Sequence, residues 1–460
     1  MSARPGPLSL EAALPGLERA AGCRFSTGHR VVPLIDGPAI FARMLDAIAG
    51  ARHTVHLENY IIRDDRIGGT FAEALARRAR EGIAVRVLFD WLGCKGTSRR
   101  YWRRLRHAGV EVRAFQPPAL LEPLANLVRD HRKGLVTDGR LAIVGGHCIG
   151  DEWAGDAAAG IPPWRDTALE VEGPAAARLD QAFARMWARA GAPLRSPADA
   201  PADAPAGDAR VAVLESEPGL ERAYRCVEWM ATAARSRCWI TDAYFVAPPR
   251  LREVLGDAAR DGVDVRLLVP GDSDLPHVRN LTRIGYRPLL RAGVRIFEWR
   301  GPMLHAKSIV TDGQWARVGS SNLNASSLSG NYELDLLVDD AALATGLQAQ
   351  FLRDLDRSRE VVVTAPAAPA RLRPPPLALV PGPGPDYHAP PRERRRRLFA
   401  LGGQLALVAR RQVALGVAVG FAIVALLFAF FPRPSALATA VLAGWLALGA
   451  LVRALRRPAP

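Results

Sequence analysis

The chain lacks most of the motifs that mark common cofactors. Its five cysteines among 460 residues include no Cys-x-x-Cys pair, which argues against a disulfide framework and against a zinc site. We find no Gly-x-x-x-x-Gly-Lys-Ser/Thr loop for a nucleotide and no His-Glu-x-x-His pair for a metal. The first 30 residues contain no continuous apolar run, so we expect no signal peptide. These absences predict reduced thiols and chemistry without a cofactor or metal.

Lysine is missing from the last 100 residues, which nevertheless carry most of the positive charge. Residues 361–460 contain 13 Arg and two acidic residues, a net +11 of the chain's +15. The first 360 residues are therefore close to neutral. Because nucleic-acid binding needs clustered cationic contacts, the body does not resemble a nucleic-acid-binding surface, and we expect no nucleic-acid partner.

The C-terminal region holds the longest apolar runs. Residues 413–431 form an uncharged run of 19 residues, and a second run covers residues 435–452. Each approaches the length that crosses a hydrocarbon core of about 30 Å. Arginines flank the outer ends of the pair, with only Arg433 in the turn. This pattern predicts a transmembrane hairpin with both ends in the cytoplasm, the alternative being two buried core helices or one re-entrant segment.

Composition shifts divide the chain into successive segments. A Pro/Ala-rich stretch separates the two halves of the body, and a second Pro-rich stretch precedes the membrane region. The predicted segments are an N-terminal segment (1–27), a first half (28–192), a linker (193–208), a second half (209–360), a Pro-rich and basic tether (361–397) and the membrane hairpin (398–460).

A short polar motif occurs once in each half. The motif His-x-Lys-x-x-x-x-Asp is found at His131, Lys133 and Asp138, and again at His305, Lys307 and Asp312. A glycine-led turn follows each copy at the same distance, Gly145-Gly146-His147-Cys148 and Gly319-Ser320-Ser321-Asn322. A single match of this length is often accidental, but the same spacing and sequel in two halves is specific. The duplication predicts one symmetric site made of two half-sites.

Other segments repeat around these motifs. Residues 54–62 match residues 238–246, each with an acidic residue two positions before a tyrosine. Helical stretches (71–80 and 251–260) and two further strand-like runs follow in each half (82–88 and 108–112; 262–268 and 292–296). Alternating strands and helices predict an α/β fold in two tandem units that meet at the motifs.

The local pattern explains how each motif can present its side chains. In a strand, positions i and i+2 face the same side, so each imidazole and its ammonium partner line one wall. Asp138 and Asp312 each precede a glycine, and we expect them to act mainly through a tight turn to the returning strand. Two such histidines suit displacement at a phosphodiester, in which one attacks phosphorus and the other protonates the leaving oxygen.

The motif pair resembles the phospholipase D superfamily, and the surrounding residues are most similar to bacterial cardiolipin synthases. The similar stretches run from about residue 28 to about residue 356 and include Asp130-His131-Arg132-Lys133, Trp164-Arg165-Asp166-Thr167 and His305-Ala306-Lys307. The resemblance implies two phospholipase D-like α/β halves with a shared active site, phospholipid substrates and a bacterial inner-membrane location with the body in the cytoplasm.

The resemblance also implies roles for the site residues. His131 would form a phosphohistidine, and His305 would act as general acid and base. Lys133, Lys307 and Asn322 would hold the non-bridging oxygens, helped by the turns at Gly145, Gly319 and Ser320. Asp166 and Glu333, at comparable places after the two motifs, would orient the histidines.

One position departs from the family pattern. Cys148 stands where the family usually has asparagine, and a thiol is a weaker hydrogen-bond donor than an amide. Either the first half-site has lost a phosphate contact, or His147 or the backbone supplies it.

Several functions share these motifs. We expect a membrane-anchored phosphatidyltransferase that makes cardiolipin from phosphatidylglycerol and a second phospholipid. A hydrolytic phospholipase D differs only in using water, and a nucleic-acid phosphodiesterase conflicts with the near-neutral body. A silent membrane scaffold would not need complete His/Lys pairs in both halves.

Overall fold

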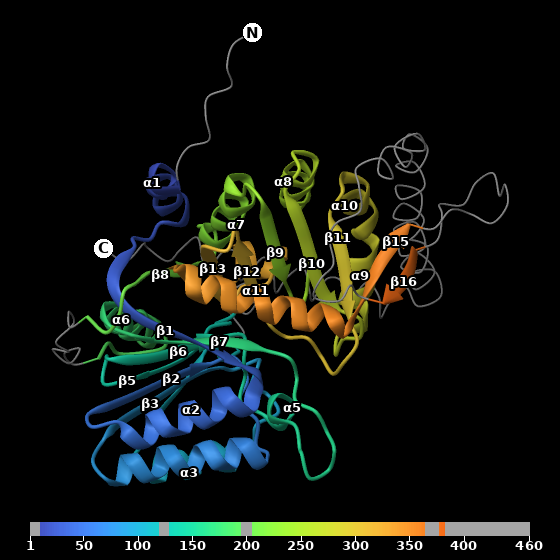
Figure 1. The fold of residues 1–460 in the computed structure, drawn as a ribbon. Helices are drawn as coiled ribbons and strands as arrows, with labels where there is room; N and C mark the ends of the chain where they lie inside the picture. Colours follow the sequence, from blue (N-terminus) through green and yellow to red (C-terminus); the bar gives the residue numbers. More distant parts are fainter. Residues whose placement is uncertain (1–9, 119–127, 195–204, 364–376, 382–460) are drawn as a thin grey trace, which may run out of the picture. The chain divides into compact units, whose positions relative to one another are not determined.

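The computed structural model describes residues 10–118, 128–194, 205–363 and 377–381, with side chains from Leu14 to Val363. Strands and helices alternate through this part of the chain, which confirms the α/β prediction (Figure 1). The predicted hairpin at 413–431 and 435–452 lies outside the described residues. Within the described ranges, every helix is too short or too polar to span a bilayer.

The first half begins after helix α1 (Leu10–Ala21) and ends with helix α6. Its elements are β1 (Ser26–Ile35), α2 (Asp36–Gly50), β2 (Thr54–Asn59), α3 (Arg66–Arg80), β3 (Ala84–Asp90), α4 (Arg99–His107), β4 (Glu111–Phe115), β5 (Lys133–Thr137), β6 (Leu141–Gly145), α5 (Asp151–Ala154), β7 (Thr167–Glu172) and α6 (Pro174–Arg189).

The second half repeats this order with one further helix, a π-helix in the place of α5, and one further strand at its end. Its elements are β8 (Ala209–Ser216), α7 (Arg222–Ala233), β9 (Arg237–Thr241), α8 (Pro249–Arg260), β10 (Asp264–Pro270), α9 (Pro276–Ile284), α10 (Tyr286–Ala292), β11 (Arg295–Trp299), β12 (Ser308–Thr311), β13 (Trp315–Gly319), the π-helix Ser326–Gly330, β14 (Glu333–Asp339), α11 (Ala341–Asp356) and β15 (Ser358–Val363).

The strand order is the same in both halves and runs outward from a common centre. From β1 the first half continues β7-β6-β5-β2-β3-β4, and from β8 the second continues β14-β13-β12-β9-β10-β11. The pairs among β2, β3 and β4, and among β9, β10 and β11, are parallel, whereas the hairpins that carry the motifs are antiparallel. Because β1 pairs with β8, the two halves join at this centre. The predicted internal repeat is confirmed.

Strand register corrects one detail of the predicted repeat. In the first half Val55 pairs with Thr137, and in the second half Cys238 pairs with Thr311. Because Thr137 and Thr311 occupy the same place in the two motifs, Val55 is equivalent to Cys238, whereas the sequence comparison had aligned Thr54 with that residue. The predicted repeat aligns Tyr60 with Tyr244. Tyr60 lies five residues after Val55, whereas Tyr244 lies six residues after the equivalent Cys238. The two tyrosines therefore reach the site from positions that are not equivalent.

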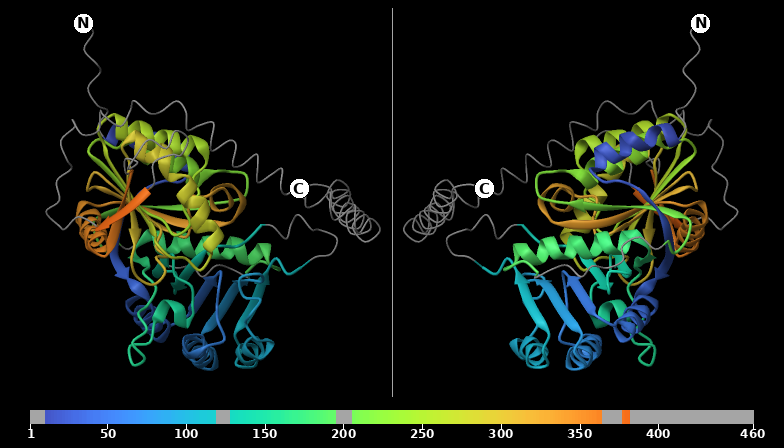
Figure 2. Two further views of the ribbon diagram at one scale, coloured as in Figure 1. Left: turned by 90° about the vertical axis from the view of Figure 1, so that its right-hand side faces the viewer. Right: turned by 90° about the vertical axis from the view of Figure 1, so that its left-hand side faces the viewer.

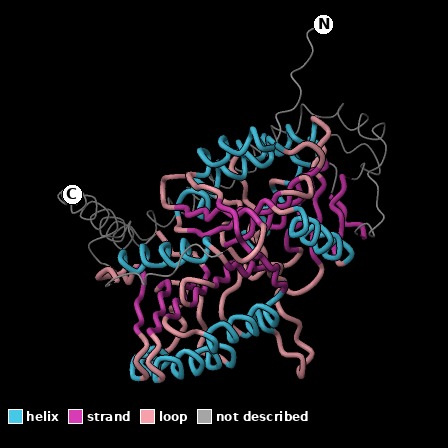
Figure 3. Tube along the Cα trace, turned by 60° about the vertical axis from the view of Figure 1, so that its left-hand side comes forward, coloured by secondary structure: helices cyan, strands magenta, loops and turns pink. Residues whose placement is uncertain are grey.

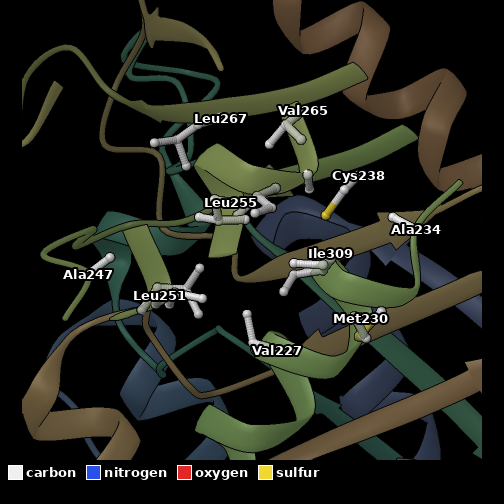
Figure 4. Close-up of a cluster of buried hydrophobic side chains, with 14 of the residues drawn as sticks. Val227, Met230, Ala234, Cys238, Ala247, Leu251, Leu255, Val265, Leu267 and Ile309 are labelled. Atoms are coloured by element: carbon white, nitrogen blue, oxygen red, sulfur yellow. The ribbon is translucent and has the colours of Figure 1, made fainter. Parts of the chain in front are cut away.

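Apolar side chains from helices and strands fill a core within each half. In the second half, Val227 and Met230 of α7 and Leu251 and Leu255 of α8 lie against strand residues such as Val265 (Figure 4). Helix α1 packs on α7 of the second half although the chain then enters the first half (Figure 2). The N-terminal helix therefore ties the two halves together.

Two equivalent helices lie where the halves meet. Helix α6 of the first half contacts β8, and α11 of the second half contacts β1. Buried side chains of both helices, among them Leu179 and Leu347, belong to a core cluster that includes strand residues from both halves. Helices α2 and α3 lie side by side on the first half and α7 and α8 on the second, outside the strands (Figures 1 and 3). This shared core fixes the distance between the two motif-bearing hairpins.

The observed elements bear on the predicted segment boundaries. The linker predicted at 193–208 falls between α6 and β8. At the other end, β15 extends to Val363 and pairs with β16 (Leu377–Pro381), so a short strand lies inside the segment predicted as a tether. Its sequence, Leu-Ala-Leu-Val-Pro, is apolar enough to add to a sheet edge.

Candidate active site

The two histidines are each held by a carboxylate from the opposite half. His131 Nδ1 lies 2.9 Å from Glu333 Oε2, and His305 Nδ1 lies 2.9 Å from Asp166 Oδ2. A carboxylate can only accept, so each Nδ1–H donates and each Nε2 keeps a free lone pair. The structure therefore brings four of the predicted site residues into two crossed pairs, and neither half can form a complete pair by itself.

The backbone repeats the same crossing. The N–H of His131 donates to the carbonyl of Tyr332 at 2.9 Å, and the N–H of His305 donates to the carbonyl of Arg165 at 2.7 Å. Tyr332 and Arg165 directly precede the two orienting carboxylates. Each histidine is thus fixed at its backbone and at its ring by the same short segment of the other half.

Different donors hold the two carboxylates. The Ser320 hydroxyl donates to Glu333 Oε2 at 2.5 Å, whereas the Trp153 indole N–H donates to Asp166 Oδ2 at 3.2 Å. The first-half counterpart of Ser320 is Gly146, where an added Cβ would lie 2.4 Å from Asp166 Oδ1. The first half therefore has no room for the serine and uses a tryptophan from the short helix α5 instead.

Both motif lysines are fully buried beside their histidines. Lys133 Nζ and Lys307 Nζ donate to the backbone carbonyls of His131 and His305 respectively. Lys307 Nζ also lies 2.9 Å from His305 Nδ1. The two ammonium groups offset the charges of the two carboxylates, and they are the groups of this site that suit the oxygens of an anionic phosphodiester.

Aromatic rings that were not predicted as site residues lie beside the motif histidines and lysines. The Tyr60 ring lies 4.8 Å from the His131 ring and 5.1 Å from Lys133 Nζ. In the second half, Tyr244 lies 5.9 Å from His305 and 5.9 Å from Lys307 Nζ. The repeated tyrosine in both halves was a signal that could have found them.

His305 has two further aromatic neighbours. The centroids of the Trp153 and Trp164 rings lie 5.3 Å and 5.8 Å from the centroid of its imidazole. Both tryptophans come from the segment around α5, and the π-helix Ser326–Gly330, which occupies this place in the second half, contains no tryptophan. No repeat marks them, so sequence comparison between the halves could not find them.

Burial sets the protonation of the pair formed by His305 and Asp166. Burial and the charge of Lys307 lower the pKa of His305 to about 3. Burial acts to raise the pKa of Asp166, but its hydrogen bond to His305 and the nearby positive charges hold it at about 2. Asp166 is therefore ionised at neutral pH while the imidazole is neutral, with its lone pair on Nε2.

The other pair has the same character. Burial lowers the pKa of His131, against the opposing effect of Glu333. The pKa of Glu333 is also lowered, because the contacts of His131, Lys133 and Ser320 outweigh the effect of burial. Burial lowers the pKa of Lys307 to about 8, so this ammonium releases a proton more readily than an exposed lysine. Both imidazoles are therefore available as nucleophile or base.

The two turn regions are alike in backbone but not in side chains. Gly145 and Gly319 lie against the neighbouring strands, where an added Cβ would come within 2.6 Å and 2.2 Å of other atoms. Asn322 is buried with no partner for its Oδ1 within the described residues, whereas Cys148 is buried at the equivalent place. His147 is buried near Phe41, with neither ring nitrogen bonded to any described group. Only the second half has an amide side chain at this position.

The motif aspartates lie apart from this group. Asp138 accepts hydrogen bonds from the backbone N–H groups of Arg52, His53 and Thr54 at 2.7 to 2.8 Å, and Asp312 makes the equivalent contacts to residues 235–237. Both aspartates have positive φ values and stand at the far ends of the strands that begin beside the histidines. Although the motif groups them with the catalytic residues, their position supports the structural role expected from the Asp-Gly turn.

Known proteins share this sequence and fold. The family described as "Cardiolipin synthase, PLD-like domain" matches residues 44–187 and 229–355, more than half of the chain. Cardiolipin synthase of Halalkalibacterium halodurans is 37% identical over 346 residues, which cover 73% of this chain and 68% of the relative. Cardiolipin synthase A of Pseudomonas aeruginosa is 35% identical over 335 residues, with 72% and 68% covered.

A solved structure supports the fold alone. The chain is similar to phosphatidylserine synthase of Haemophilus influenzae with a TM-score of 0.59 and 14% sequence identity, over 75% of this chain and 92% of the other. The predicted family resemblance is confirmed by the sequence matches. The chain therefore belongs to the cardiolipin synthase family and is an enzyme of the phospholipase D type, a phosphatidyltransferase.

Proposed function

We propose that the enzyme transfers a phosphatidyl group from one phospholipid to the glycerol hydroxyl of phosphatidylglycerol, which makes cardiolipin. The observation that carries the proposal is the pair of crossed histidine–carboxylate contacts, each at 2.9 Å. They leave an Nε2 lone pair on each of two imidazoles that lie beside two ammonium groups. Two such bases suit a double displacement in which the protein is the intermediate acceptor.

In the first step, His131 Nε2 attacks the phosphorus of the donor lipid. The bond from phosphorus to the leaving alcohol oxygen breaks. His305, which takes up a proton on Nε2 when the anionic lipid binds beside it, gives that proton to the leaving oxygen. The product is a phosphatidyl group bound to His131. Lys133, Lys307 and the Asn322 amide hold the non-bridging oxygens, where negative charge builds.

In the second step, His305 takes the proton of the acceptor hydroxyl. The oxygen attacks phosphorus and the bond to His131 breaks, so the enzyme returns to its starting state. The carboxylates of Glu333 and Asp166 stay ionised throughout and stabilise each imidazole when it becomes positive. Water in place of the acceptor would give phosphatidic acid by the same route.

We also propose that the enzyme is anchored in the bacterial inner membrane. The support is the pair of apolar runs at 413–431 and 435–452 with arginines outside them. An anchor of this kind would keep the catalytic halves at the cytoplasmic surface, where the phospholipid substrates are.

The test is a lipid conversion assay on the membrane-embedded protein beside His131→Ala. Phosphatidylglycerol is offered with and without phosphatidylethanolamine, and mass spectrometry identifies the products. Cardiolipin formed only by the unaltered enzyme supports the transferase, and the dependence on phosphatidylethanolamine identifies the donor. Phosphatidic acid as the sole product would replace the transferase with a hydrolase.

The nucleophile is assigned by trapping. His305→Ala is expected to accumulate a phosphatidyl group on His131 when the donor lipid carries a p-nitrophenyl leaving group. This group departs without a proton, so the first step proceeds, whereas the second step has lost its base. The covalent lipid is detected by mass spectrometry of the intact protein. A covalent lipid in His131→Ala instead would reverse the two roles.

A further inference from the structure

The exposed large apolar side chains of the first half are gathered at one end of its strands. Trp91 and Leu92 directly follow β3, and Ile161 lies in the loop between α5 and Trp164. Asp90 at the end of β3 accepts a hydrogen bond from the backbone N–H of Asp130. The segment that carries Trp91 and Leu92 is therefore attached directly to the backbone beside His131.

The second half repeats this arrangement. Leu220 follows β8, and Leu275, Leu281 and Ile284 lie in or next to α9, which follows β10. Ile284 is 66% exposed, although it belongs to a regular helix. Asp274, next to Leu275, accepts a hydrogen bond from the Tyr244 hydroxyl at 2.9 Å, and Tyr244 faces His305.

The opposite ends of the strands differ. There the loops hold the turn aspartates Asp138 and Asp312, and among the described residues none of the exposed large apolar side chains lies at that end. A single exposed leucine needs no explanation. The restriction of all the exposed large apolar side chains of the described residues to the active-site end of both halves does need one.

Positive charge accompanies the first-half patch. Helix α4 begins shortly after Leu92 and exposes Arg99, Arg100 and Arg103, for which the described residues offer no acidic partner. Arg99, Arg103 and Arg106 line a surface groove of about 460 Å³ together with Trp102. Apolar side chains beside unpaired guanidinium groups complement a surface that is anionic at its headgroups and apolar below them.

We propose that the active-site end of the catalytic halves docks directly on an anionic phospholipid bilayer. Trp91 and Leu92 in the first half, and Leu281 and Ile284 in the second, enter the headgroup region. The arginines of α4 bind the lipid phosphates. This docking rests on the proposed function, because its purpose is to place the site that contains both histidines against the lipid from which the substrate comes.

The first experiment measures contact with lipid without using activity. The full-length protein carrying Ile284→Cys, and separately Leu92→Cys, is labelled with a fluorophore in vesicles of phosphatidylglycerol and phosphatidylcholine. Lipids with a bromine or spin label near the headgroup are then added. We expect strong quenching at both positions and none at Ala342→Cys, an exposed site at the opposite end of the strands. No quenching at positions 92 and 284 would overturn the proposal.

The second experiment separates docking from catalysis. We expect Leu281→Glu with Ile284→Glu, and Trp91→Glu with Leu92→Glu, to lower turnover of vesicle phosphatidylglycerol about tenfold or more, since each change removes two side chains from an apolar environment. Turnover of monomeric short-chain phosphatidylglycerol is expected to stay within about twofold, because that substrate needs no bilayer docking. Equal losses on both substrates, or none on vesicles, would contradict docking.

Charge and matched controls complete the test. Arg99→Gln with Arg100→Gln and Arg103→Gln should weaken the increase of turnover with phosphatidylglycerol content, whereas Ala342→Glu should behave as the unaltered enzyme. If the unaltered enzyme converted neither lipid form but positions 92 and 284 were still quenched, the proposed function would fail and docking would stand. If lipid did not quench positions 92 and 284 but these positions cross-linked to another protein, a protein partner would be the occupant and the lipid surface would be overturned.

Discussion

The two half-sites have the same backbone frame but support it with different chemistry. In the second half, Arg317 and Asp335 form a buried ion pair at 2.9 Å, and Ser321 also donates to Asp335. Strand register shows that the first-half equivalents of this ion pair are Ile143 and Ala168. One half therefore uses a buried charge network where the other uses apolar packing. The conserved geometry of the histidines does not depend on either solution.

The same contrast holds closer to the reacting atoms. Glu333 is held by a serine and Asp166 by a tryptophan, yet both carboxylates reach their histidine at the same distance. What the reaction requires is an oriented imidazole in each half. The groups behind each carboxylate were free to differ. The following experiments test how far this equivalence goes, from the largest expected effect to the smallest.

Removing the charge of either orienting carboxylate should produce the largest loss. Glu333→Gln and Asp166→Asn are each expected to reduce kcat by about 10²- to 10⁴-fold, because the amide no longer fixes the tautomer or stabilises the imidazolium. Steady-state kinetics with thermal unfolding as a control measures this. If one variant kept near-normal kcat, the two half-sites would be functionally unequal.

Breaking the buried charge network should mainly affect stability. Asp335→Ala leaves the Arg317 guanidinium buried without its partner and is expected to cost about 3–5 kcal/mol of unfolding free energy. Arg317→Ile combined with Asp335→Ala copies the first half and should recover part of that loss. Denaturant unfolding compares the two. A double variant less stable than Asp335→Ala would show that the halves are not interchangeable.

The equivalent positions Asn322 and Cys148 allow an amide to be removed from one half-site and added to the other, with smaller expected effects on kcat. Asn322→Ala is expected to lower kcat by about 10²-fold, the effect of losing one donor to a developing negative charge. Cys148→Asn introduces an amide into the first half. It should preserve kcat or raise it about two- to tenfold, which corresponds to the free energy of one additional hydrogen bond in the transition state. A folded but inactive Cys148→Asn protein would contradict a phosphate contact at this position.

The turn aspartates should have the smallest effect. Burial acts to raise the pKa of Asp138 and Asp312, but three backbone N–H groups at each carboxylate outweigh it and lower both pKa values. A lowered folded-state pKa contributes stability that is complete above the unfolded pKa of about 4 and is lost as pH falls through the folded pKa.

Asp138→Asn and Asp312→Asn should therefore lower stability by about 1 kcal/mol at pH 7, a modest value because both groups are partly exposed. The difference from the unaltered enzyme should shrink below pH 4, and kcat should change little. Unfolding measured between pH 3 and pH 7 gives the result. A large loss of kcat without a loss of stability would make these aspartates catalytic after all.

Local patterns were enough to predict much of this fold. The apolar run before Asp138, the Asp-Gly turn and the returning run predicted the β5–β6 hairpin, and all three depend only on near neighbours in the chain. The duplicated motif predicted that His131 and His305 share a site. It could not predict the crossing of the carboxylates, because Glu333 is 202 residues from His131.

The sequence by itself determined the α/β class, the internal repeat and the chemical groups of the site, because each is encoded in residue type and short-range spacing. Tertiary structure alone decided which carboxylate orients which histidine and that Trp153 supports Asp166. It also decided that the exposed apolar side chains gather at the active-site end of both halves. These features depend on how β1 and β8 join the halves, and contacts between distant segments leave no periodic trace in the chain.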